Sequence, residues 1–202
     1  MLGGSPLARK LRIGVFGGSF DPVHHAHLIV ARLAAEQLQL DRVHFVVAAT
    51  QPFKDGRHAA TAEQRFRMVE LAVAGVADFV ADGRELRRPS PSYTIDTLRE
   101  LVAEAPGAEL ALLIGADVAR RFGEWREPAE IRKLARIAVF RRGDLGVPDA
   151  GATGFDAEVA VPSIEISSTA IRARAAAGQS LAGWVPPAVA DYIVASQVYV
   201  EL

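Results

Sequence analysis

Short apolar segments alternate with longer helical segments along almost the whole of this 202-residue chain. Strands that alternate with helices at this spacing favour a parallel sheet, because each crossover between parallel strands needs a long connection. We therefore expect an α/β fold that is Rossmann-like and doubly wound, with a mostly parallel sheet and helices on both faces. The expected strands are 11–16, 42–48, 78–81, 109–114, 137–140 and 158–161, and the expected helices include 61–74, 92–104, 128–134, 167–177 and 187–195.

The composition narrows the class of protein. Lys and Arg total 23 against 24 Asp and Glu, so the chain lacks the basic excess of a general nucleic-acid binder. There is no cysteine, which excludes disulfides, cysteine-ligated zinc and a cysteine nucleophile. Residues 1–10 lack the apolar stretch of a signal peptide, and no apolar run approaches the ~20 residues of a membrane span.

These observations predict a cytoplasmic protein with one domain over residues 1–202 and no membrane partner. Residues 1–10 are expected to form a flexible extension, and residues 163–202 a helical C-terminal part of the same domain. The apolar content, half of all residues, is compatible with a homodimer and equally with a monomer.

A glycine-rich segment follows the first expected strand. Gly17 and Gly18 can bring backbone N–H groups close to an anion, and the N-terminus of the next helix adds partial positive charge. His24 and His27 are three residues apart, so their imidazoles share a helix face and can donate hydrogen bonds to a polyphosphate. A metal-binding pair and two solvated histidines are the alternatives, although metal pairs more often use i, i+4 spacing.

A second candidate anion site opens the expected helix 167–177. Ser167 and Ser168 precede its apolar residues, and Arg172 lies near its first turn. Hydroxyls, free backbone N–H groups and a guanidinium at one helix start can bind phosphate. The alternative is an ordinary serine-capped helix with a solvated arginine.

Both segments resemble the nucleotidylyltransferase superfamily. The first reads Gly-Gly-Ser-Phe-Asp-Pro-x-His-x-x-His-Leu, with Ala26 where that family usually has Gly, and the second reads Ile-Ser-Ser-Thr-x-Ile-Arg. Further stretches are similar to the bacterial nicotinate-nucleotide adenylyltransferases: Ser-Tyr-Thr-x-Asp-Thr-Leu at 92–98, Gly-Ala-Asp at 115–117, Trp125, and Pro-Phe-Lys at 52–54, where Phe53 replaces a histidine. The resemblance spans roughly residues 13–199.

That resemblance implies transfer of the adenylyl group of ATP to nicotinate mononucleotide, without a covalent intermediate. It assigns catalytic roles to His24, His27, Lys54 and Arg172. Residues expected to contact ATP are Gly17, Gly18, Ser19, Phe20, Gly115, Asp117, Ile166, Ser167 and Ser168. Thr94, Trp125 and Arg141 are expected to contact the mononucleotide.

The resemblance also implies that Mg²⁺ arrives with ATP and is held mainly by phosphates and water, without a protein ligand cluster. Three alternatives remain open at this point. The acceptor could instead be nicotinamide mononucleotide or pantetheine phosphate, or the chain could be a non-catalytic module that binds nucleotides.

Overall fold

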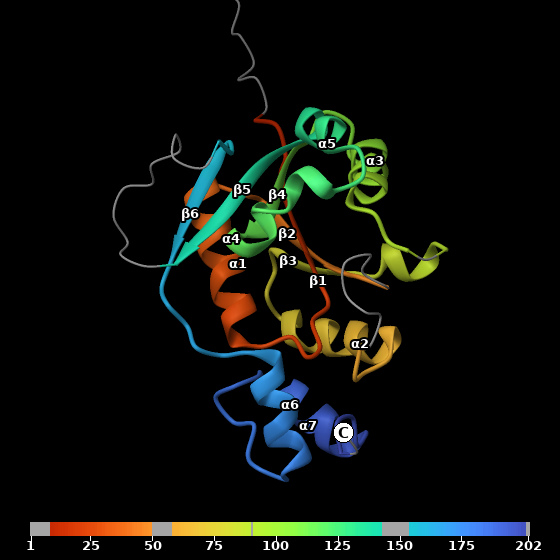
Figure 1. The fold of residues 1–202 in the computed structure, drawn as a ribbon, viewed down its shortest axis with the longest axis vertical. Coiled ribbons are helices and arrows are strands. Elements are labelled where there is room, and N and C mark those ends of the chain that lie inside the picture. The colour runs from red at the N-terminus through yellow and green to blue at the C-terminus, as the bar shows by residue number, and fades with distance from the viewer. Residues whose placement is uncertain (1–8, 50–57, 90, 143–153, 201–202) are drawn as a thin grey trace, which may run out of the picture.

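The computed structural model describes residues 9–49, 58–89, 91–142 and 154–200. Six parallel strands form one sheet in the order β3-β2-β1-β4-β5-β6, which confirms the predicted doubly wound α/β fold (Figure 1). The strands are β1 (Arg12–Gly18), β2 (Arg42–Val47), β3 (Phe79–Asp82), β4 (Glu109–Gly115), β5 (Ala135–Arg142) and β6 (Ala157–Val161). The helices are α1 (His25–Leu38), α2 (Ala62–Val73), α3 (Thr94–Glu104), α4 (Ala116–Ala119), α5 (Pro128–Leu134), α6 (Ser168–Ala176) and α7 (Pro187–Ala195), with short 3-10 turns η1 (Arg84–Arg87) and η2 (Phe122–Glu124).

Two hydrophobic clusters cover opposite faces of the sheet. Alternation along β1 separates them, because Ile13 and Val15 belong to one cluster and Phe16 to the other. Buried residues of α1, α2, α6 and α7 pack with Phe16, whereas those of α3 and α5 pack with Ile13 and Val15. The helices therefore lie on both faces, as the sequence predicts.

The first residues of α2 and α3 can be compared with the helix starts that the sequence predicts. The spacing of Thr61 and Gln64 predicts a capping box, and the two residues form one at the start of α2, where each side chain bonds the other residue's backbone N–H. Ser92 and Thr94 are residue types that favour a helix N-cap, and the sequence therefore predicts that one of them caps this helix, but neither caps α3. Tyr93 occupies the N-cap position without a side-chain hydrogen bond, and the Ser92 hydroxyl instead bonds Glu85.

The strand order reverses between β1 and β4, where the chain leaves β3 at one edge and returns beside β1. Val15 of β1 pairs with Leu112 of β4, so Gly18 and Gly115, three residues further along each strand, end at the same edge of the sheet. Ligands of doubly wound folds bind at this switch point. The fold thus brings the glycine-rich segment and the Gly-Ala-Asp segment together.

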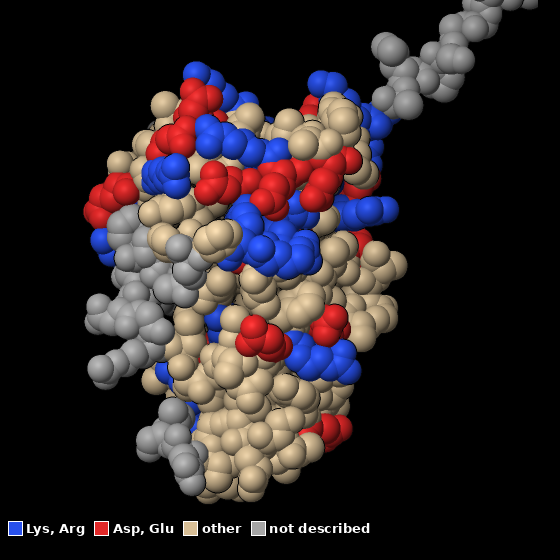
Figure 2. Space-filling model, turned by 90° about the vertical axis from the view of Figure 1, so that its right-hand side faces the viewer, with Lys and Arg blue, Asp and Glu red and all other residues tan. Residues whose placement is uncertain are grey.

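Charged side chains gather over the part of the surface that α3 and η1 help to form, and few lie over the C-terminal helices (Figure 2). On this face side chains of both signs lie next to one another (Figure 2). Between η1 and α3, Arg88 bonds Glu100 and Arg84 bonds Glu104. Within the described ranges, no helix is long and apolar enough to cross a bilayer.

Candidate active site

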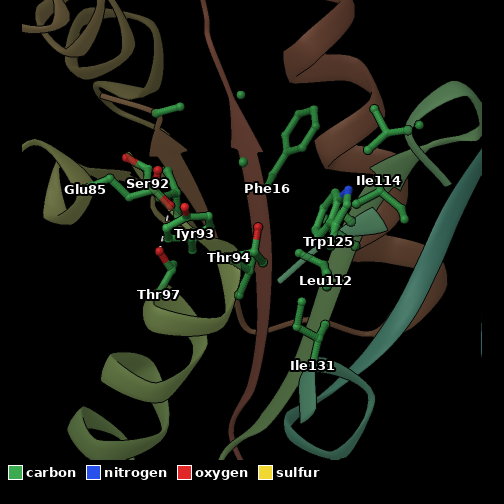
Figure 3. Close-up of a pocket in the computed structure, with 18 of the residues that line it drawn as sticks. Phe16, Glu85, Ser92, Tyr93, Thr94, Thr97, Leu112, Ile114, Trp125 and Ile131 are labelled. Atoms are coloured by element: carbon green, nitrogen blue, oxygen red, sulfur yellow. Dashed lines mark hydrogen bonds between the residues drawn. The ribbon is translucent and has the colours of Figure 1, made fainter. Parts of the chain in front are cut away.

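A cavity of about 720 Å³ opens at the carboxyl ends of β1 and β4, on the face covered by α3 and α5 (Figure 3). Gly17 and Gly115 line it, and a Cβ added to either would meet no described atom within 4 Å. Glycine therefore leaves room there for a ligand to approach the backbone. Of the predicted site residues, the cavity brings together Gly17, Gly18, Thr94, Gly115, Asp117 and Trp125.

The walls of this cavity suit a flat apolar group with a polar edge. Figure 3 shows Tyr93 and Thr94 on one side and Trp125 on the other, beside Leu112 and Ile114 of β4. The Trp125 ring is half-buried against Phe122, with ring centroids 5.4 Å apart. One part of the Trp125 side chain thus packs against the core, and another part faces the cavity.

The buried carboxylate of Glu85, to which the sequence assigns no role, also lines the cavity. Glu85 of η1 accepts a hydrogen bond of 2.6 Å from the Thr97 hydroxyl and one from Ser92. Burial raises the pKa of Glu85, although these hydrogen bonds and the charge of Arg88 act in the opposite direction. The network fixes the start of α3, and with it Tyr93 and Thr94, to the end of β3.

The loop after β1 packs tightly around Phe20. A Cβ on Gly18 would lie 2.8 Å from the Phe20 ring, so this position requires glycine. Arg65 of α2 is only 1% exposed and donates to the carbonyl oxygens of Ser19 and Ala48 at 2.7 and 2.8 Å. A buried guanidinium therefore ties the loop to the end of β2 and fixes its path.

His24 and His27 meet at the start of α1, where His24 is the N-cap. Their rings stack with centroids 3.8 Å apart, which confirms that the two imidazoles share a face. His27 Nδ1 accepts from the backbone N–H of His24 at 3.3 Å, so the proton of a neutral His27 resides on Nε2, a donor.

His24 is nearly inaccessible to solvent, and its Nδ1 has no hydrogen-bond partner within the described part of the chain. Burial, together with the neighbouring charge of His25, lowers the pKa of His24 to about 4. The imidazole is therefore neutral at pH 7. A buried polar nitrogen without a partner is costly unless a ligand or water satisfies it.

The N-terminus of α6 is packed against the loop after β1. Ser168 Oγ donates to the carbonyl oxygen of Pro22 at 2.9 Å, and Arg172 Nη1 donates to that of Asp21 at 2.8 Å. Ser167 caps the helix, since its Oγ accepts from the backbone N–H of Ala170. The two anion-binding segments predicted separately from the sequence thus lie side by side.

A further set of contacts, centred on Asp21, has no counterpart in the roles predicted from the sequence. The Asp21 carboxylate is buried and accepts hydrogen bonds from the backbone N–H groups of Ala59 and Ala60 and from the Tyr199 hydroxyl at 2.8 Å. Burial and the negative charge of Asp21 raise the pKa of Tyr199. We call these four residues the Asp21 clasp. It joins the loop to the chain before α2 and to the C-terminal segment.

Some predicted site residues stand apart from these groups. Arg141 lies within β5 rather than beyond its end, because the strand continues to Arg142, and its Nε pairs with Glu158 at 3.3 Å. Asp117 is exposed at the rim of the cavity and pairs with Arg120. Lys54, with its neighbours Gln51 and Phe53, lies outside the described residues.

The side chains around the loop after β1 are mainly hydrogen-bond donors, which suit phosphate oxygens better than a metal ion. Across the described ranges, no group of three or more His, Asp or Glu side chains gathers in a way that could hold a metal. The one carboxylate in the loop, Asp21, is already bonded within the clasp.

Comparisons with known proteins add independent information. The model of the cytidylyltransferase-like family matches residues 15–174. A protein of Chromobacterium violaceum named as a probable nicotinate-nucleotide adenylyltransferase is 41% identical over 210 residues, which cover 93% of this chain and 98% of that protein. A protein of Thermus thermophilus with the same name is 44% identical over 189 residues, covering 94% of this chain and all of its own length.

Among solved structures, the nicotinic acid mononucleotide adenylyltransferase of Plasmodium falciparum complexed with NaAD matches with a TM-score of 0.72. The match covers 94% of this chain and 97% of that one at 18% identity, so it concerns the fold alone.

Proposed function

This chain belongs to the cytidylyltransferase-like family and, within it, to the nicotinate-nucleotide adenylyltransferases, and from that premise we propose that it transfers the adenylyl group of ATP to nicotinate mononucleotide. The products are pyrophosphate and nicotinate adenine dinucleotide. The observation that carries the proposal is the placement of an aromatic-walled cavity and a cluster of phosphate-type donors at the same strand ends, where β1 meets β4.

The reaction needs no nucleophile from the protein. The phosphate of the mononucleotide is ionised at pH 7, and one of its oxygens attacks the α-phosphorus of ATP. The bond from that phosphorus to the bridging oxygen breaks, and pyrophosphate leaves with the electron pair. Catalysis by such an in-line displacement comes from positioning and from stabilising charge on the phosphoryl oxygens.

His24 and His27 supply that stabilisation in this proposal. His27 Nδ1 accepts from the backbone N–H of His24, and we assign the donation to a phosphate oxygen to Nε2–H. His24 is neutral at pH 7 and offers the buried nitrogen that lacks a protein partner within the described ranges. Both imidazoles act as neutral donors that strengthen as the pyrophosphate leaves.

The start of α6 binds the remaining phosphates. Ser168 and Arg172 bond the carbonyl oxygens of Pro22 and Asp21, and Ser167 caps the same helix, which supports a role for this helix start beside the histidines. Ile166 and the backbone N–H groups of the first turn of α6 complete this side, because helix N-termini favour anions. Lys54, outside the described residues, is proposed to neutralise further phosphate charge.

The cavity holds the mononucleotide. Trp125 stacks on the pyridine ring, and Thr94 offers a donor to the ring substituent. Gly17 to Phe20 and Gly115 lie against the nucleotide backbone, and Asp117 reaches a ribose hydroxyl. Arg141 remains a proposed contact of the mononucleotide, although it does not line the cavity.

Mg²⁺ is proposed to enter as part of the ATP substrate, where it neutralises phosphate charge. The donor-rich loop fits the phosphates and not the ion, so phosphate oxygens and water hold the metal.

The test is pyrophosphate release from ATP, measured with nicotinate mononucleotide, nicotinamide mononucleotide and pantetheine phosphate supplied separately. We expect release with the nicotinate form. Release only with another acceptor would replace the proposed substrate, and release with none of the three would indicate a module that binds nucleotides without catalysis.

A further inference from the structure

We propose that the Arg126 side chain selects the acid form of the mononucleotide by pairing with the carboxylate on its pyridine ring. Neither the motifs nor the relatives' names assign a role to this residue. The inference rests on the proposed function, because it requires the pyridine ring to occupy the cavity beside Trp125.

The position of Arg126 is set by its neighbours in the cavity wall. Arg126 follows Trp125 directly, and both line the cavity together with Tyr93 and Thr94. The Arg126 guanidinium lies over the Tyr93 ring at 4.7 Å from the centroid, so a cation–π contact holds it. The positive charge therefore lies beside Tyr93, across the cavity from Trp125, and we expect it near the edge of a pyridine ring stacked on Trp125 (Figure 3).

The acidic side chains that line the cavity are already bonded to other groups. Asp117 pairs with Arg120, and Glu124 accepts two hydrogen bonds from Arg121 at 2.7 and 3.0 Å. Glu85 is bonded by Thr97 and Ser92. These contacts also commit Arg121, the other cation of the cavity wall, to Glu124.

Acidic side chains hold the Arg126 guanidinium less closely than that of Arg121. Its ion pair, with Glu127, is long at 3.8 Å, and Glu127 is held more closely by Arg99 at 2.6 Å. In the described parts of the chain, no hydrogen bond occupies the Arg126 guanidinium. Of Arg121 and Arg126, the two cations among the described residues that line the cavity, Arg126 is thus the one available to an anion in the ligand.

The two possible acceptors differ in charge, and the Arg126 guanidinium therefore favours one of them. Nicotinate carries a carboxylate, with which a planar guanidinium forms charge-assisted hydrogen bonds, whereas nicotinamide carries a neutral amide. The Arg126 side chain is 52% exposed, so water screens part of this preference. We expect Arg126 to account for about a 5- to 30-fold preference for the acid.

The experiment compares kcat/KM for nicotinate and nicotinamide mononucleotides in the wild type, Arg126→Gln and Arg126→Lys. The glutamine variant keeps a polar side chain but shortens it and removes the charge, so kcat/KM for the acid should fall about 5- to 30-fold and that for the amide should change less than about twofold. The lysine variant should recover part of the preference. The KM for ATP should stay unchanged.

Arg87→Gln is the matched control, because Arg87 is an exposed arginine of η1 outside the cavity and its loss changes the net charge equally. An acid-to-amide ratio that is the same in Arg126→Gln and in the wild type would overturn the inference while leaving the proposed function intact. A wild type that uses neither mononucleotide would overturn the proposed function, and this inference with it.

Discussion

The two ring nitrogens of His27 have different proposed roles, one structural and one catalytic, and two substitutions can test these roles separately. Its Nδ1 accepts from the His24 backbone, and its Nε2–H is the proposed donor to phosphate. An asparagine amide oxygen can take the place of Nδ1 but cannot reach the position of Nε2. His27→Asn should therefore keep the contact at the start of α1 and lose the donor, whereas His27→Ala should lose both.

Loss of one donor that acts in the transition state costs about 10²- to 10³-fold in kcat, equivalent to about 2.7–4 kcal/mol. Both variants should show this loss, with the KM for ATP changed by less than about threefold, because the interaction is strongest in the transition state. Loss of a helix cap costs about 0.5–2 kcal/mol, so only the alanine variant should show a lower free energy of unfolding of that size.

The assay is steady-state pyrophosphate release at saturating substrates, paired with urea unfolding of each variant. Turnover of His27→Asn within about tenfold of the wild type would refute the role of Nε2–H. Equal loss of activity and stability in the two variants would instead mean that His27 acts only by holding the start of α1.

Three further predictions test other parts of the site. Trp125→Ala should raise the KM for nicotinate mononucleotide at least about fivefold more than the KM for ATP, because the lost stacking of one ring is worth about 1–3 kcal/mol; equal effects would exclude stacking. Tyr199→Phe removes one donor to the buried Asp21 carboxylate and should lower the free energy of unfolding by about 1–3 kcal/mol in urea titrations; an unchanged value would contradict the clasp. The pKa of His24 is about 4 in the folded protein and about 6.5 in the unfolded chain. The unfolded chain therefore binds the proton first as the pH falls. The free energy of unfolding is unaffected by this group above pH 6.5 and decreases by up to about 3 kcal/mol between pH 6.5 and pH 4. Urea unfolding at pH 7.5 and 4.5 should therefore show a smaller loss at low pH for His24→Gln than for the wild type, and an equal loss would disprove the lowered pKa.

The sheet and most helices could be predicted from the sequence because their signals are local. The apolar run of β4 and the capping box at Thr61 each depend on a few neighbouring residues, and both appear in the structure. That the imidazoles of His24 and His27 share a face also followed from their spacing alone. Local patterns were weaker at element ends, so the continuation of β5 through Arg141 and the N-cap at Tyr93 were missed.

The supports of the site could not be predicted in this way, because they join distant parts of the chain. Tyr199 bonds Asp21 across 178 positions, and Arg65 bonds Ser19 across 46. Glu85 gave no signal at all, since in the sequence it is one charge among several in a loop, and only the packing of η1 on α3 buries it.

The central claim is that the mononucleotide phosphate attacks the α-phosphorus of ATP directly at the strand ends of β1 and β4. It is tested most directly with ATP whose α-phosphorus is made chiral by a sulfur substitution, and nicotinate mononucleotide as acceptor. A single in-line displacement predicts a dinucleotide with inverted configuration at that phosphorus. Retention of configuration would require two displacements through a covalent enzyme intermediate and would contradict the account.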